Sequence, residues 1–286
     1  MNWFETSDVP DRRIGARELW MWCLVLSAVA FWGKVIAASD DPDPLLPSAI
    51  VNSITDAGAF TAAAWIMVMM RAGGVVSDRA ASTRLVLVAL GIGLLCVVPL
   101  RPASAIVLAV LGGTLLLSQQ ATRSGRQAGL LLVSLAIVSA SYILVPVHVW
   151  VASLDARAVA WIGRLFGMDA SADGNVVTQG DFALEILLQC TSTVQLAQVA
   201  LAFCVVVVYR RGQCRRSDLP WLLSALLASA VLTEIRLTLM LRGEADYVWW
   251  HDGAGATMYL LAAMASAALF PLLATARSAT RAGQPA

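Results

Sequence analysis

A thiol, a guanidinium and an imidazole follow one another in the second half of the chain. They belong to Cys190, Arg236 and His251, which are separated by 46 and 15 residues. A cysteine thiol is mostly protonated at neutral pH, and a neighbouring cation lowers its pKa. An imidazole can take that proton and return it to a leaving amine, while a guanidinium can bind a developing oxyanion. These residue types therefore predict acyl transfer through a thioester.

The remaining histidine and cysteines are weaker candidates. His148 lies at the end of a predicted helix at a similar depth, so position alone leaves it open as a rival base. Cys23, Cys96 and Cys204 lie within apolar runs, where a free cysteine is usually inert. Cys214 comes after the predicted helix that contains Cys204, and no histidine lies on the same side of the membrane. With five cysteines, no CxxC spacing and two histidines, we expect no metal, cofactor or disulfide framework.

Composition defines the environment of these groups. Of 286 residues, 59% are apolar and 14% charged, the mean hydropathy is +0.74 and the net charge is +1. These values exclude a disordered chain, a disulfide-rich secreted domain and a basic protein that binds nucleic acid. They predict an all-α fold, a polytopic membrane helical bundle forming a single integral membrane domain over residues 1–286.

Eight apolar segments approach the length of about 20 residues that a helix needs to cross a bilayer. The expected transmembrane helices are Leu19–Ala38, Ile50–Met70, Leu85–Leu100, Ala103–Ser118, Ala128–Trp150, Leu184–Tyr209, Leu219–Leu241 and Ala254–Ala274. Of the basic residues in the loops, 14 fall on one side and four on the other. Because basic loops stay cytoplasmic, we expect both termini in the cytoplasm.

This topology predicts that the three reactive groups share one depth. Cys190 precedes Tyr209 by 19 residues, about 28 Å of helix, and Arg236 follows Leu219 by 17 residues, about 25 Å. Both positions lie at the outer boundary of their helices. His251 precedes the last predicted helix on the same side. We therefore expect the three groups to meet at the outer face of the membrane.

The longest segment outside the membrane is an outer-face connector over residues 151–183. Its first half repeats apolar residues at helical spacing, with Arg157 and Arg164 on the other face, which predicts a short amphipathic helix on the membrane surface. Asp173-Gly174-Asn175 predicts a tight turn, and Val176-Val177-Thr178 predicts a short strand.

Several stretches of the second half resemble the exosortase/archaeosortase family of membrane cysteine transpeptidases. The resemblance spans about residues 150–256. It is carried by the connector and by three motifs: Glu185–Ser192 around the cysteine, Glu234-Ile235-Arg236-Leu237 around the arginine and Trp250–Gly255 around the histidine. The chain departs from the family pattern at Thr233, where many members have asparagine.

The resemblance implies a catalytic region over residues 184–256. Cys190 would be the nucleophile, Arg236 would stabilise the transition state or substrate, and His251 would be the general base and acid. Substrate contacts are expected from residues in or near these motifs, namely Trp161, Thr191, Ser192, Glu234, Trp250 and Asp252.

The same resemblance implies the partners and the location. Substrates would be exported proteins that carry a C-terminal motif, a membrane helix and a basic tail, such as those with the PEP-CTERM signal. The enzyme would lie in a bacterial or archaeal cytoplasmic membrane, with its active site on the outer face.

Two other classes of function stay open at this point. A transporter or channel would use intramembrane charges such as Glu234 and Arg236, and Cys190 would then be dispensable. A non-catalytic component of polysaccharide or protein export would need none of the three reactive groups.

Overall fold

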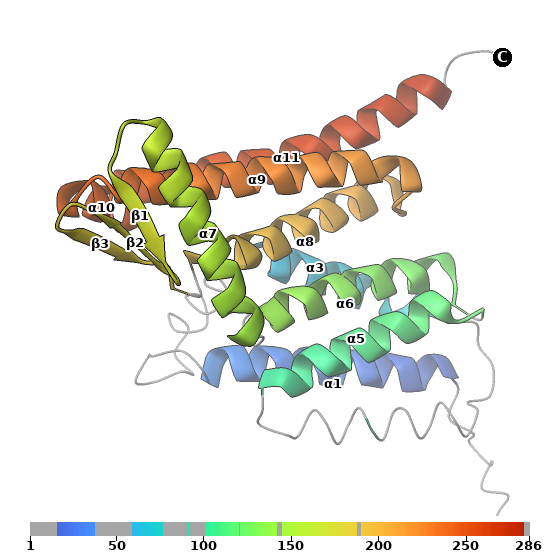
Figure 1. Ribbon diagram of the computed structural model, residues 1–286. Helices are drawn as coiled ribbons and strands as arrows, with labels where there is room; N and C mark the ends of the chain where they lie inside the picture. The colour runs from blue at the N-terminus through green and yellow to red at the C-terminus, as the bar shows by residue number, and fades with distance from the viewer. Residues whose placement is uncertain are drawn as a thin grey trace, which may run out of the picture.

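A computed structural model describes residues 16–37, 59–76, 91, 101–119, 121–141, 145–187 and 190–282. These parts of the chain are mostly helical (Figure 1). The α-helices are α1 (Ala16–Ala37), α3 (Ala59–Arg71), α5 (Arg101–Leu117), α6 (Arg123–Ser141), α7 (Val145–Leu165), α8 (Ser192–Arg211), α9 (Leu219–Met240), α10 (Glu244–His251) and α11 (Ala254–Ala282). Short 3₁₀ turns are η1 (Ala72–Gly74) and η3 (Arg216–Asp218), and the strands are β1 (Ala170–Asp173), β2 (Val176–Gln179) and β3 (Phe182–Glu185).

Three helical segments in the described part of the chain are long and apolar enough to cross a membrane. They are Ser192–Arg211, Arg216–Met240 and Ala254–Ala276, and two shorter apolar helices cover Phe60–Arg71 and Pro102–Leu117. The membrane character and the mostly helical fold are confirmed, whereas eight transmembrane helices are not. Of the expected segments, Leu85–Leu100 and the start of Ile50–Met70 lie almost entirely outside the described residues.

The expected helix Ala128–Trp150 is wrong as a single span. Helix α6 ends at Ser141, and a separate helix, α7, begins at Val145 and continues to Leu165. Pro146 explains where the new helix starts, because proline has no N–H to donate and is tolerated in a first helical turn. The amphipathic helix expected on the membrane surface is therefore the second half of α7, which crosses the ends of the other helices (Figure 1).

The expected helix Leu184–Tyr209 also begins too early. Leu184 lies in β3, and α8 starts only at Ser192. The three strands form an antiparallel sheet in the order β1-β2-β3, in which Asp173 pairs with Val176 and Gln179 with Phe182. The predicted turn and strand are thus confirmed and extended by two strands. This correction places Cys190 in the segment between a strand and a helix.

Small residues bring α5 and α6 close together. A Cβ atom built on Gly112 would lie 2.7 Å from the carbonyl oxygen of Gly129, and one built on Gly129 would lie 2.9 Å from that of Gly112. Glycine and other small residues permit such an approach between membrane helices. A Cβ on the next residue, Gly113, would meet nothing within 4 Å.

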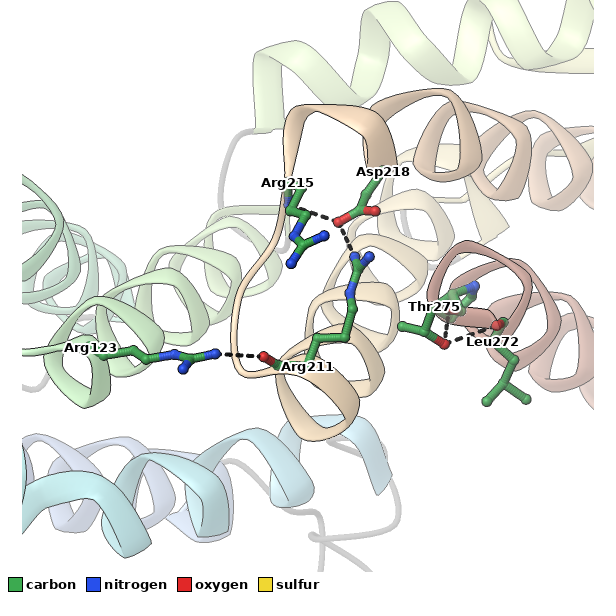
Figure 2. A network of polar contacts seen from close by, with 7 residues as sticks. Arg123, Arg211, Arg215, Asp218, Leu272 and Thr275 are labelled. Atoms are coloured by element: carbon green, nitrogen blue, oxygen red, sulfur yellow. Dashed lines mark hydrogen bonds and ion pairs between the residues drawn. The ribbon is translucent and has the colours of Figure 1, made fainter. Parts of the chain in front are cut away.

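A polar network joins three elements at the end of the bundle away from the sheet (Figure 2). The buried carboxylate of Asp218 pairs with the guanidinium of Arg211 and accepts a hydrogen bond from the backbone N–H of Arg215 at 2.7 Å. The guanidinium of Arg123 on α6 donates to the carbonyl oxygen of Arg211 at 3.0 Å. Together these contacts fix the turn between α8 and α9. They thereby fix how the two helices are oriented relative to each other.

Candidate active site

Cys190 lies at the junction of the sheet with α8. Its backbone N–H donates to the carbonyl oxygen of Leu187 at 2.9 Å, and its half-buried side chain packs against a hydrophobic cluster. That cluster is built by α7, the sheet and the C-terminal part of α9, from Ala152, Ala156, Val159, Ala160, Ala170, Val177, Leu184, Ile186, Leu237, Met240 and Leu241. Trp250 of α10 packs against the same cluster. The nucleophile candidate is therefore held by elements from four parts of the chain.

Asp155 of α7 anchors the segment that follows Cys190. Its carboxylate accepts hydrogen bonds from the backbone N–H of Ser192 at 2.9 Å and from the Ser192 hydroxyl at 2.8 Å. The side chain is only 5% exposed. A carboxylate at a helix N-terminus is favoured because free N–H groups give that end a partial positive charge. Asp155 thus fixes the start of α8 two residues after the thiol.

Glu234 of α9 lies beside the same anchor. Its carboxyl group is within hydrogen-bonding reach of Asp155. Two carboxyl groups in contact repel one another when both are charged. Asp155 accepts two hydrogen bonds from Ser192 and is therefore the better placed of the two to carry the charge. The predicted substrate-contact residues Ser192 and Glu234 are thus brought together here, with their polar atoms directed at Asp155.

Arg236 reaches the site from α9. Its Nε donates to the backbone carbonyl oxygen of Trp250 at 3.1 Å, and its guanidinium carbon lies 4.6 Å from the centre of the Tyr259 ring. Its charge acts on Cys190. Burial raises the pKa of the Cys190 thiol, while the positive charge of Arg236 and the hydrogen bond involving Leu187 oppose that rise. The Cys190 side chain is therefore a neutral thiol at neutral pH.

His251 is the last residue of α10, directly after the carbonyl group that binds Arg236. Its Nδ1 lies 2.8 Å from a carboxylate oxygen of Asp252, and its ring stacks on Tyr247 with centroids 4.9 Å apart. A carboxylate at Nδ1 holds that nitrogen protonated and leaves Nε2 as the basic atom. Among the described residues no hydrogen bond joins Cys190 to His251, and the two are connected through Arg236 and Trp250.

The other predicted residues take different positions. Thr191 is fully buried in the extended turn before α8. Trp161 on α7 is 58% exposed, and other members of the expected amphipathic face are exposed as well. No described contact links Trp161 to Cys190. His148, the rival base, is 3% exposed, and neither ring nitrogen has a hydrogen-bond partner in the described part of the chain. Its imidazole is thus shut away from any surface substrate.

An open groove of about 300 Å³ lies on α9 next to Arg236. It is mainly apolar and is lined by Phe166, Met168, Ile235, Thr238, Leu239 and Arg242. The groove therefore lies between the residues that follow α7 and the C-terminal half of α9.

Two residues at this site were not given a role from the sequence. Asp155 sits on the face of α7 that also buries Ala152, Ala156 and Val159, so a carboxylate within a buried stripe was the available signal. Tyr259, which contacts Arg236, lies in an apolar helix where nothing in the pattern distinguishes it.

Apolar helices long enough to span a membrane, together with Cys190 and Arg236 close enough to interact electrostatically, define a polytopic membrane protein with a polar site. The chain belongs to the transmembrane exosortase family, whose model matches residues 57–268. Searches among curated proteins and among solved structures gave no match. Family membership supports a function related to protein sorting at the membrane.

Proposed function

We propose that the protein is a membrane-embedded cysteine transpeptidase or protease that cleaves a sorting signal near the C-terminus of exported proteins. One observation carries the proposal: Cys190 and Trp250 pack against the same hydrophobic cluster, and the carbonyl oxygen of Trp250, directly before His251, holds Arg236. The match to the transmembrane exosortase family agrees with this chemistry.

The reaction uses the three groups in turn. His251, oriented by Asp252, takes the thiol proton as the sulfur of Cys190 attacks the scissile carbonyl carbon. Arg236 donates hydrogen bonds to the oxyanion that forms. The C–N bond then breaks, the proton passes from His251 to the leaving amine, and a thioester remains. An amine or water attacks the thioester and releases the thiol.

The proposed substrate is an exported protein with a short C-terminal motif, a membrane helix and a basic tail. The proposed location is the inner membrane, with both termini cytoplasmic and the active site on the outer face. Support comes from the arginine bias of the loops and from the course of α8, which starts beside Cys190 and ends at Arg210 and Arg211.

Size analysis of a candidate substrate expressed with each variant tests the proposal. We expect Cys190→Ala to abolish cleavage and Cys214→Ala, at the other end of α8, to leave it unchanged. His251→Gln should abolish cleavage, whereas His148→Gln should retain it in folded protein. Unchanged processing by the Cys190 variant would refute the mechanism. Loss only in the His148 variant would transfer the base to that residue.

A further inference from the structure

A chain of polar contacts lies behind Arg236, on the side of Tyr259. Tyr259 belongs to α11 and is 8% exposed. Its hydroxyl lies 3.0 Å from the hydroxyl oxygen of Thr233 on α9, and it also contacts the guanidinium of Arg236. The proposed reaction assigns no role to either hydroxyl.

The direction of this chain follows from counting protons. The Thr233 hydroxyl donates to the backbone carbonyl oxygen of Ser229 at 3.0 Å, and a carbonyl group can only accept. Thr233 has no second proton, so the bond to Tyr259 is donated by the phenol. The phenol oxygen then keeps its lone pairs for the N–H groups of Arg236. The hydrogen bonds run in one sense, from Tyr259 to Thr233 to Ser229, and each polarises the next, with the guanidinium of Arg236 beside the phenol at the head of the chain.

The guanidinium is consequently held from more than one direction. The ring of Tyr259 lies under it at 4.6 Å, which is a favourable distance for a cation over an aromatic face. Its Nε is bound to the carbonyl oxygen of Trp250. Cys190 interacts electrostatically with both Arg236 and Tyr259. An arginine on a flexible stem loses much of its freedom when it is fixed in this way before the substrate arrives.

We propose that Tyr259 is a positioning residue that holds Arg236 against Cys190 through its hydroxyl group. This inference rests on the proposed function, because it assigns to Arg236 the stabilisation of the oxyanion. Tyr259 itself touches no reacting atom. Its effect is to keep the guanidinium donors fixed, which a transition state needs more than a ground state does.

Tyr259→Phe tests the hydroxyl, because this variant keeps the ring and removes one oxygen atom. Tyr209→Phe is the matched control, since Tyr209 is 76% exposed in the last turn of α8. Two quantities are measured on full-length protein in detergent. The first is cleavage of a co-purified candidate substrate, and the second is the pH dependence of Cys190 alkylation by iodoacetamide, followed by mass spectrometry.

We expect Tyr259→Phe to lower kcat about tenfold with little change in KM, as the loss of one hydrogen bond to a charged group predicts. The alkylation profile of Cys190 should move to higher pH, because a loosened guanidinium favours the thiolate less. Thr233→Val should act in the same direction more weakly, and Tyr209→Phe should match the wild type. A purely structural role would lower the melting temperature without moving the alkylation profile.

The outcomes separate the two proposals. Wild-type kcat and an unshifted alkylation profile in Tyr259→Phe would overturn the role of Tyr259. Cleavage that survives Cys190→Ala would refute the proposed function instead, while the alkylation profile would still report on the coupling between Tyr259 and the thiol. If Tyr259→Phe fails to fold, Thr233→Val decides: a normal profile and normal cleavage in that variant overturn the inference.

Discussion

Replacing Asp155 by asparagine should destabilise the protein by weakening the anchor of α8. Asp155→Asn keeps the shape of the side chain and removes its charge. The carboxylate now accepts two hydrogen bonds from Ser192, at 2.9 and 2.8 Å, and is almost fully buried. An asparagine has one acceptor oxygen, which can accept from the Ser192 N–H, while its NH₂ group donates to the Ser192 hydroxyl oxygen. The variant therefore replaces two charge-assisted hydrogen bonds by two neutral ones.

The size of the effect follows from three contributions. A hydrogen bond to a charged acceptor contributes about 1.5–3 kcal/mol and a neutral one about 0.5–1.5 kcal/mol, so the two bonds together lose about 2 kcal/mol. A carboxylate at a helix N-terminus contributes a further ~0.3–1 kcal/mol. Burying an amide costs less than burying a charged carboxylate, which acts in the opposite sense and offsets about 1 kcal/mol. The net loss in the free energy of unfolding is about 2 kcal/mol. Ser192→Ala, which removes only the hydroxyl, should cost about 1 kcal/mol.

Reversible unfolding in SDS and dodecyl maltoside micelles measures these differences. The double variant Asp155→Asn/Ser192→Ala should show a coupling energy of about 1 kcal/mol or more, as residues that share a hydrogen bond do. Glu234→Gln is the matched control, because it changes the carboxyl group beside Asp155 to an amide and leaves both Ser192 bonds intact. If Asp155→Asn and Ser192→Ala prove additive, or if Glu234→Gln is the more damaging change, the anchor described above is wrong.

Two further predictions concern the thiol and the helix pair α5 and α6. Because burial raises the pKa of Cys190, its alkylation rate should reach half its maximum at a higher pH than that of free cysteine. Arg236→Gln should move that midpoint to a still higher pH. A midpoint below that of free cysteine would contradict the assigned burial. Gly112→Ala should lower the free energy of unfolding by about 1–3 kcal/mol because its Cβ meets the carbonyl oxygen of Gly129, whereas Gly113→Ala should be neutral or stabilising. Equal effects at the two glycines in the same micelle titration would show that α5 and α6 pack differently.

Chain length and hydropathy predict the part of the fold that depends on burying apolar surface along an axis. Helix α9 ends one residue from the boundary expected at Leu241, and α11 begins at the expected Ala254. The same signal fails at Leu184, where an apolar strand runs directly into the apolar region ahead of α8. It fails again at Pro146, because hydropathy does not register a missing N–H. The first error displaces a boundary, whereas the second joins two separate helices, α6 and α7, into one.

Residues of the candidate site were predictable from the sequence where their chemistry is unusual for their surroundings. They were not predictable where the rotation of a helix about its axis decides which side chains are in contact. Cys190 and Arg236 are unusual residues at the ends of apolar segments, so their positions along the chain carry information. Tyr259 and Thr233 meet only because α9 and α11 turn particular faces toward each other. A helix that is apolar on all sides does not encode that rotation in its sequence. Asp155 is an intermediate case, since a carboxylate on a buried helix face indicates that it has a polar partner but does not identify that partner.

Burial and Arg236 act on the Cys190 thiol in opposite directions, and burial prevails. The thiolate is the form that oxidants and alkylating agents attack, so a neutral resting thiol is protected at the surface of a membrane. The proposed reaction then needs a base at the moment the substrate binds. The His251–Asp252 pair can supply it, because Nε2 is left basic and the backbone of Trp250 ties that pair to Arg236. A movement of α10 would therefore shift the base and the oxyanion donor together, which would couple proton removal to stabilisation of the charge that it creates.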